Sequence, residues 1–206
     1  MRIATWNVNS INARLETALA VIADLNADVI CLQELKCEDH RFPREAFEDL
    51  GFNVATHGQK TYNGVAILSK HPIEEASPRL PGDPDDDQAR YLEAVITRDG
   101  GAVRVASMYM PNGNPVESPK FPYKLAWMER LIGHARGLLA LEEPVVLAGD
   151  YNVIPRPEDC HDPRAWAGDA LFRPESRAAH RALLNLGYTD AFDALDGRSG
   201  QYTFWD

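Results

Sequence analysis

Three separated stretches of this 206-residue chain each run apolar and then end at a carboxylate or a carboxamide. They are Ile3-Ala-Thr-Trp-Asn7, Val29-Ile-Cys-Leu-Gln-Glu34 and Val145-Val-Leu-Ala-Gly-Asp150-Tyr-Asn152. A side chain such as Glu34, placed directly after buried β-branched residues, loses much of its hydration energy unless a cation or hydrogen-bond donors meet it there. Several such strand ends together predict a metal site.

The expected metal is a hard cation. Oxygen ligands at strand ends suit Mg²⁺ or Mn²⁺, which keep several waters and take only one or two protein carboxylates. Glu34 is the candidate for direct ligation. Such an ion neutralises phosphate oxygens and stabilises the charge that builds during an in-line displacement. The pattern therefore indicates phosphoester cleavage.

Further polar residues at strand ends suit the same chemistry. Asp150 can accept a proton from an attacking water, and Asn152, two residues on, can orient that water or a phosphate oxygen. Tyr109 ends another apolar run and can donate to the phosphate. The alternative is that Asn7, Asp150 and Asn152 are ordinary turn formers. Each alone fits that alternative, but their occurrence together favours a site.

The elements that position these residues follow from hydrophobic periodicity. Helices are predicted over residues 12–25, 43–50, 122–141 and 174–186, and additional strands over residues 52–55, 64–69, 91–97 and 103–110. Asp99-Gly100-Gly101 reads as a hairpin turn between the last two strands. The mixture of hairpins and alternating helices predicts the α/β class, with sheets face to face and helices outside.

Composition narrows the class of protein. The length and the 45% hydrophobic content fit one domain with a large core. A net charge of -10 argues against a protein that coats nucleic acid by bulk electrostatics, although a local basic face remains possible. No apolar run approaches the ~20 residues of a membrane span. The three cysteines form no paired motif, so we expect reduced thiols in a cytoplasmic protein with no membrane association.

Seven short strings in this chain resemble those of the bacterial exonuclease III family of apurinic/apyrimidinic endonucleases, in the family's order. They are Trp6-Asn-Val-Asn9, Leu32-Gln-Glu-Leu-Lys36, Gly64-Val-Ala-Ile-Leu-Ser69, Tyr109-Met-Pro-Asn-Gly113, Lys120-Phe-Pro122, Leu147-Ala-Gly-Asp-Tyr-Asn152 and Tyr202-Thr-Phe-Trp205. The wider endonuclease/exonuclease/phosphatase superfamily shares the Glu and Gly-Asp-x-Asn elements. The Lys-Phe-Pro and Tyr-Thr-Phe-Trp strings favour the DNA-repair branch.

The resemblance implies a four-layer α/β sandwich of two mixed, mostly antiparallel sheets with helices outside. It also implies Mg²⁺-dependent cleavage of the DNA backbone 5' to abasic sites, with 3'-to-5' exonuclease action and trimming of 3' ends. The implied partner is double-stranded DNA carrying abasic sites or 3' ends, and the implied state is a monomer. A relative acting on lipid or inositol phosphates is the alternative within the superfamily.

Roles for individual residues also follow from the resemblance. Asn7 and Glu34 would hold the metal, Tyr109 would touch the scissile phosphate, Asp150 would activate water and Asn152 would help to fix the phosphate.

The resemblance assigns supporting and DNA-contacting residues as well. Lys36 would hydrogen-bond Asn9 beside the metal, and the DNA-contacting set would be Lys60, Tyr62, Asn112, Phe204 and Trp205. The last two would wall a pocket for a flipped, base-free sugar. For these two aromatics, simple core packing is the alternative.

The chain departs from the family at its end. Members continue with a strand bearing Arg-Ile-Asp and a final Ser-Asp-His, which supply two further acids and a histidine, whereas this sequence ends at Asp206. None of the six histidines lies in a matching context. We therefore expect residues 1–206 to form a single domain that lacks its C-terminal strands, as a fragment or as a shortened form. Without those groups, an inactive module that binds abasic DNA is a further alternative.

Overall fold

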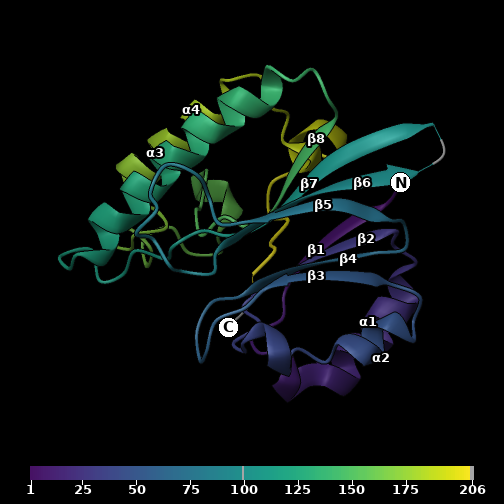
Figure 1. The fold of residues 1–206 in the computed structure, drawn as a ribbon. Helices are drawn as coiled ribbons and strands as arrows, with labels where there is room; N and C mark the ends of the chain where they lie inside the picture. The colour runs from purple at the N-terminus through teal and green to yellow at the C-terminus, as the bar shows by residue number, and fades with distance from the viewer. Residues whose placement is uncertain (99, 205–206) are drawn as a thin grey trace. The chain divides into compact units, whose positions relative to one another are not determined.

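The structure is a computed structural model that describes residues 1–98 and 100–204 (Figure 1). Two residues of the sequence predictions, Asp99 of the hairpin turn and Trp205, lie outside the described residues. Contacts between Cα atoms divide the chain into two compact units. Unit 1 comprises Met1–Met110 and Leu138–Tyr151, and unit 2 comprises Pro111–Gly137 and Asn152–Asp206.

Unit 1 contains two four-stranded sheets. The first sheet has the order β1 (Ile3–Asn7), β2 (Val29–Gln33), β4 (Val65–Ser69), β3 (Asn53–His57). The second has the order β5 (Ile73–Pro78), β6 (Tyr91–Arg98), β7 (Gly101–Tyr109), β8 (Val145–Asp150). The pairs β1–β2 and β7–β8 are parallel, and the other pairs are antiparallel. Each sheet therefore carries one parallel pair at one of its edges.

The two sheets pack face to face (Figure 1). The core between them is built from both sheets by Val29, Cys31, Val65, Ile67, Leu92, Ala94, Ile96 and Val105. On the outer face of the first sheet, α1 (Leu15–Leu25) and α2 (Arg44–Glu48) bury Ile22 and Phe47 against the strands. Every residue of β2 and β4 is buried, which explains why these strands are apolar up to their last residues, Gln33 and Ser69, rather than alternating.

Unit 2 is helical. It contains α4 (Pro174–Leu184), α5 (Ala191–Leu195) and α3 (Lys120–Leu139) except for the last two residues of α3. Short 3₁₀ helices lie at Asn12–Arg14 and Asp39–Arg41 in unit 1 and at Pro157–Asp159 in unit 2. Among the described residues, no helix is both long and apolar enough to cross a membrane.

The predicted fold class is confirmed, and most elements lie within a few residues of their expected bounds. The strand β5 and the helix α5 were missed. Strand β5 reads Ile-Glu-Glu-Ala-Ser-Pro, lies mostly exposed at a sheet edge and contains a register shift, so it shows no period-two pattern. Helix α5 has only five residues and rests on an N-terminal cap by Asp190 rather than on a long apolar face.

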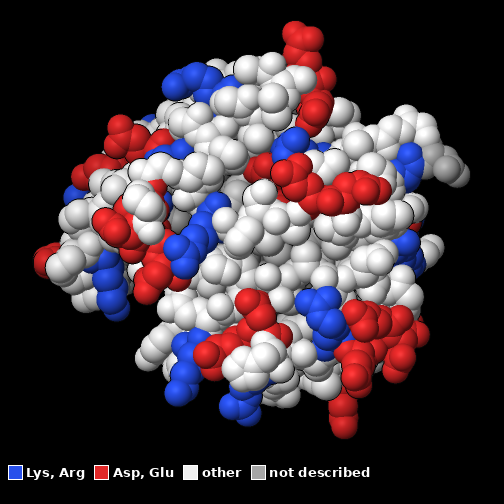
Figure 2. Space-filling view, viewed as in Figure 1, with Lys and Arg blue, Asp and Glu red and all other residues white. Residues whose placement is uncertain are grey.

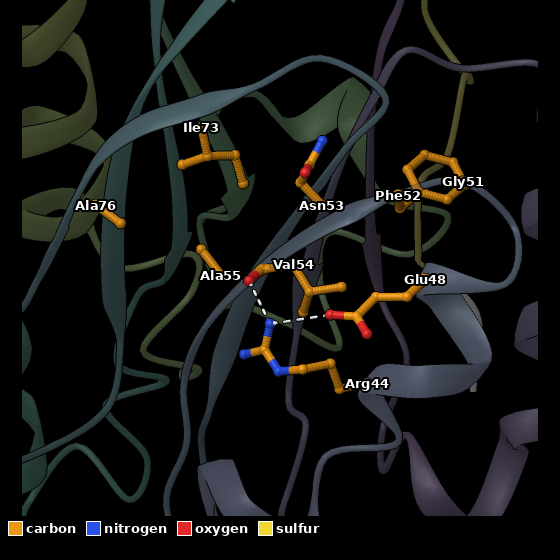
Figure 3. Close-up of a pocket in the computed structure, with 9 residues that line it drawn as sticks. All are labelled: Arg44, Glu48, Gly51, Phe52, Asn53, Val54, Ala55, Ile73 and Ala76. Atoms are coloured by element: carbon orange, nitrogen blue, oxygen red, sulfur yellow. Dashed lines mark hydrogen bonds and ion pairs between the residues drawn. The ribbon is translucent and has the colours of Figure 1, made fainter.

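A groove lies where the edge strands β3 and β5 meet, at the sheet edges opposite to β1 and β8 (Figure 3). There Arg44 donates to the carbonyl oxygen of Val54 at 2.7 Å and approaches Glu48 at 3.7 Å. A charged side chain on an edge-strand carbonyl discourages pairing with another strand. The groove contains none of the predicted site residues.

Gly149 permits the close approach of β8 to β7. Its φ is +151°, and a Cβ there would lie 2.0 Å from the carbonyl oxygen of Met108. We predict that Gly149→Ala lowers the free energy of unfolding by more than about 3 kcal/mol or prevents folding, because the backbone itself must move. Urea unfolding followed by circular dichroism measures this.

The matched control is Gly137→Ala in α3, where an added Cβ meets nothing within 4 Å. That change should raise stability by roughly 0.5–1 kcal/mol, since glycine is unfavourable inside a helix. Equal unfolding midpoints for the two variants would contradict the argument.

Candidate active site

Four strand ends of unit 1 converge. Asn7 ends β1, Glu34 follows β2, Tyr109 ends β7 and Asp150 ends β8. Tyr109 and Asp150 are register partners across β7 and β8, and Asn7 pairs in the same way with the residue before Glu34. Because both pairs are parallel, the carboxyl ends of their strands reach a common edge, and β1 contacts β8 across the two sheets. The topology thus brings together residues up to 143 positions apart.

The carboxamide of Asn7 lies between two carboxylates. Its Nδ2 donates to Oε1 of Glu34 at 2.8 Å and to Oδ2 of Asp150 at 2.9 Å. Its Oδ1 accepts from the backbone N–H of Asn9 at 3.0 Å. Since a backbone N–H can only donate, this last bond fixes which end of the amide is oxygen. Glu34 and Asp150 are therefore held beside each other by one shared donor group.

Glu34 has donors on both oxygens. Lys36 Nζ lies 2.9 Å from Oε2 and also donates to Oδ1 of Asn9, and the Tyr109 hydroxyl donates to the carboxylate. Burial alone would raise the pKa of Glu34, but the hydrogen bonds from Asn7, Lys36 and Tyr109 outweigh it and hold that pKa below its ordinary value. The Glu34 side chain, 19% exposed, is therefore ionised at neutral pH.

Tyr109 keeps its proton. Burial and the neighbouring charge of Glu34 raise the pKa of Tyr109 well above its usual range. The phenol is therefore a hydrogen-bond donor at neutral pH. The guanidinium of Arg90 lies 5.0 Å from the centre of its ring and donates to its carbonyl oxygen at 3.3 Å. Arg90 was not anticipated from the sequence, since a single arginine before a strand gives no signal.

The turns that carry these residues adopt uncommon backbone conformations. Asn9, Glu34 and Lys36 have φ values of 45°, 56° and 56°. Non-glycine residues in this region are strained and persist only where the surroundings hold them. Here the turn is held by backbone hydrogen bonds from Leu35 to Gly64 at 3.1 Å and from Ser10 to Glu34 at 2.7 Å.

A buried polar bridge joins the two sheets next to the site. Gln33 Nε2 donates to Oγ of Ser107 and to Oγ1 of Thr5, each at 3.1 Å, and Ser107 Oγ donates to the carbonyl oxygen of Leu32 at 3.0 Å. Gln33 and Ser107 are both buried. Because buried polar groups need partners of defined geometry, this bridge sets the sheets in one register. Polar residues inside apolar strands were the available signal, and sequence reasoning missed it.

The remaining predicted residues lie in other parts of the chain. Lys60 and Tyr62 are exposed in the loop between β3 and β4, Tyr62 by 68%. In unit 2, Asn112 Nδ2 donates to Oδ1 of Asn152 at 3.3 Å. Phe204 is 63% exposed, with its ring 6.5 Å from that of Trp166, so core packing does not account for it.

The donor set of unit 1 fits a hard cation. Glu34 and Asp150 offer carboxylate oxygens, and the neighbouring Asn7 offers a carboxamide. In the described residues no group of three or more His, Cys, Asp and Glu could by itself hold a metal ion. Hard cations such as Mg²⁺ in general take only one or two protein carboxylates and keep several waters.

Paired sheets with carboxylates, an amide and a tyrosine at one end define a phosphoesterase of the α/β-sandwich type. Comparison with known proteins gives the family: residues 4–206 match the model of the endonuclease/exonuclease/phosphatase family. The chain belongs to this family, whose members depend in general on divalent metal ions.

The similar proteins act on DNA. Exodeoxyribonuclease III of Haemophilus influenzae is 31% identical over 100% of this chain and 79% of its own length. The structure of the 3' phosphatase NExo from Neisseria bound to a product DNA hairpin matches at a TM-score of 0.93, with 37% identity over 100% of this chain and 79% of that one. An AP endonuclease from Archaeoglobus fulgidus also gives 0.93, with 34% identity over 100% and 78%. The protein is thus a DNA-repair nuclease, a hydrolase of DNA phosphodiester bonds.

The shared amide gives a test of the site. In the metal-free protein, Asn7→Asp should lower the free energy of unfolding by about 1–3 kcal/mol at pH 7, since it replaces the donor with a third carboxylate. The repulsion raises the pKa of the new carboxyl in the folded state above its unfolded value of about 3.9. The loss of stability is therefore complete above the raised pKa, decreases as the pH falls below it, and disappears below the unfolded pKa. Urea unfolding in EDTA at pH 7 and pH 4 measures it.

Asn7→Leu serves as the control. It removes the same donors without adding charge, so its penalty should change less between the two pH values. The same pH dependence in both variants would argue against a carboxylate pair bridged by Asn7.

Proposed function

We propose that this protein is a Mg²⁺-dependent enzyme that cleaves the DNA backbone 5' to abasic sites and trims 3' ends of duplex DNA. The observation that carries the proposal is the pair of carboxylates, Glu34 and Asp150, bridged by Asn7 beside the hydroxyl of Tyr109. The similar AP endonuclease from Archaeoglobus fulgidus and the similar 3' phosphatase from Neisseria with its product DNA support both activities.

Each residue has a distinct task in this mechanism. Glu34, held ionised, would bind the ion, and the carboxamide oxygen of Asn7 would be a second ligand. The ion supplies charge neutralisation at the phosphate. Tyr109 donates its phenolic proton in a hydrogen bond to a phosphate oxygen, and Asp150 takes the proton from the attacking water. Asn152 donates to the phosphate.

Supporting residues act through these groups and on the DNA. Lys36, which bonds both Glu34 and Asn9, keeps the metal-binding turn in place. The exposed Phe204, with Trp205 beside it in sequence, forms the wall that receives a base-free sugar, because a missing base lowers the cost of flipping. We further propose a monomer that acts in the cytoplasm.

The proposal is tested with three DNA duplexes: one with an abasic site, one with a 3' phosphate and one intact. The full-length protein with Mg²⁺ should nick the first at the 5' side, release phosphate from the second and degrade the third only slowly from its 3' end. Internal cutting of intact and abasic duplexes at equal rates would overturn the assignment. Release of phosphate from inositol polyphosphates without any DNA cleavage would favour the lipid or inositol branch instead.

The roles of Glu34 and Asp150 can be separated. We predict that Glu34→Ala and Asp150→Asn each lower turnover by about 10²–10⁴-fold, because each removes charge stabilisation or proton transfer. Only Glu34→Ala should also raise the Mg²⁺ concentration needed for half-maximal rate. Steady-state kinetics over a Mg²⁺ titration gives both quantities.

Glu75→Ala, in the exposed edge strand β5, is the matched control and should retain full activity. Unchanged turnover in either site variant, with an unchanged melting temperature, would show that the site is misassigned.

Binding of DNA by this acidic protein needs local cations. On the face shown in Figure 2, Lys and Arg side chains are interspersed with Asp and Glu. We therefore propose that a few cations near the site make the phosphate contacts, Lys60 among them. Each such contact contributes a fixed increment to the salt dependence of affinity.

Lys60→Ala should weaken binding of abasic and intact duplexes alike and reduce the slope of log affinity against log salt by about 1. Fluorescence anisotropy at several salt concentrations measures this slope. Lys70→Ala is the control, because Lys70 lies over the ring of Phe52 and is given no DNA contact. A slope that is the same in both variants would remove Lys60 from the interface.

A further inference from the structure

Lys124 of α3 is a completely buried cation, with 0% exposure. Its Nζ donates to the carbonyl oxygen of Asn112 at 3.2 Å and to that of Asn152. A buried ammonium is costly unless acceptors of good geometry replace its water. Both acceptors belong to residues whose side chains are expected near the phosphate. Lys124 therefore ties together two segments that lie 40 residues apart in the chain.

The backbone next to Asn112 adopts a conformation that lets it approach this lysine closely. Gly113 has φ +91°, and a Cβ there would lie 2.7 Å from Cδ of Lys124 and 3.1 Å from Cβ of Ala170. Only glycine fits such a backbone at such a distance. The residue after Gly113 is also held: Oδ1 of Asn114 accepts from the backbone N–H of Ala170 at 3.0 Å, and its Nδ2 donates to Oδ2 of Asp169 at 3.0 Å.

Two successive hydrogen bonds fix the orientation of the Asn152 side-chain amide through that of Asn112. The backbone N–H of Asn114 donates to Oδ1 of Asn112 at 3.1 Å, which identifies that atom as oxygen. The other end of the Asn112 amide is therefore Nδ2, a donor, and it faces Asn152 at 3.3 Å. The atom of Asn152 that accepts this bond must be Oδ1. The Nδ2 of Asn152 is consequently turned away from Asn112.

We propose that Lys124 and Asn112 are positioning residues that hold Asn152 with its amide N–H groups presented as donors to the substrate phosphate. This inference rests on the function proposed above. Lys124 sets where the backbone of Asn152 lies, and Asn112 sets which end of its side chain points outward. A phosphate oxygen accepts hydrogen bonds and cannot donate them, so an Asn152 amide turned the other way would repel it.

The first test compares Lys124→Met with Leu131→Ala in the full-length protein. Methionine keeps the alkyl stem but leaves both carbonyl acceptors unpaired, and Leu131→Ala destabilises the same helix about 10 Å further along its axis. At a temperature below both melting transitions, Lys124→Met should lower kcat for abasic-site nicking by roughly 10–100-fold with little change in KM. Leu131→Ala should keep its kcat.

The second test uses Asn112→Asp, whose carboxylate accepts from Asn152 and so reverses its amide. We expect a loss of kcat similar to that of Lys124→Met, and a double variant no slower than the slower single variant, because both act through Asn152. Unchanged kcat in Lys124→Met, or losses that multiply in the double variant, would overturn the inference while leaving the proposed function intact.

An independent readout covers the case in which the wild-type protein does not cut abasic DNA. The side-chain amide signals of Asn152 in a ¹⁵N–¹H spectrum should shift or broaden in Asn112→Asp and Lys124→Met and stay in place in Leu131→Ala. A wild-type protein without nicking would defeat the proposed function alone. Asn152 signals that do not move in the first two variants would defeat the positioning role alone.

Discussion

The structure of unit 1 depends on one hydrogen-bonded bridge, in which the amide of Asn7 separates the carboxylates of Glu34 and Asp150. Two like charges this close are unfavourable unless donors or a cation lie between them. The bridge holds only if β1 and β8, from different sheets, end at the same level. The parallel pairing at each sheet edge and the Gln33–Ser107 bond between the sheets meet that requirement. Much of the architecture of unit 1 serves to place three polar groups.

In unit 2, oxygen acceptors are likewise held together by a shared nitrogen donor, which is a cation instead of an amide. Lys124 is buried against backbone carbonyls and holds two asparagines in mutual contact. In both units a nitrogen donor sits between oxygen acceptors that would otherwise need water. Placing such donors away from solvent makes their geometry rigid, since no water competes for the acceptors. Rigid placement of donors is what a phosphate-transfer site requires, because positioning and electrostatics do most of the work there.

Sequence reasoning found the strand ends because each reads locally as an apolar run that stops at Asn7, Glu34 or Asp150. It also found the sandwich, since β2 and β4 are apolar except for their last residues and α3 is amphipathic. It missed Gln33, Arg90 and Lys124, whose partners lie 12 to 74 residues away and become neighbours only in the fold. Lys124 had a weak signal: it follows Phe121 by three residues and precedes Met128 by four, so it occupies an apolar position of the helix. A lysine at such a position implies buried acceptors, but not which ones.

The charge of the site explains how an acidic protein can act on a polyanion. With a net charge of -10, the chain as a whole repels DNA. Around the strand ends, however, the carboxylates of Glu34 and Asp150 are matched by the cations of Lys36 and Arg90, and Tyr109 stays neutral because its pKa is raised. A divalent ion bound to this balanced set would make the site locally positive. Because the amide of Asn7 is neutral, it adds no third negative charge beside Glu34 and Asp150, and a bound ion would keep more of its attraction for a phosphate.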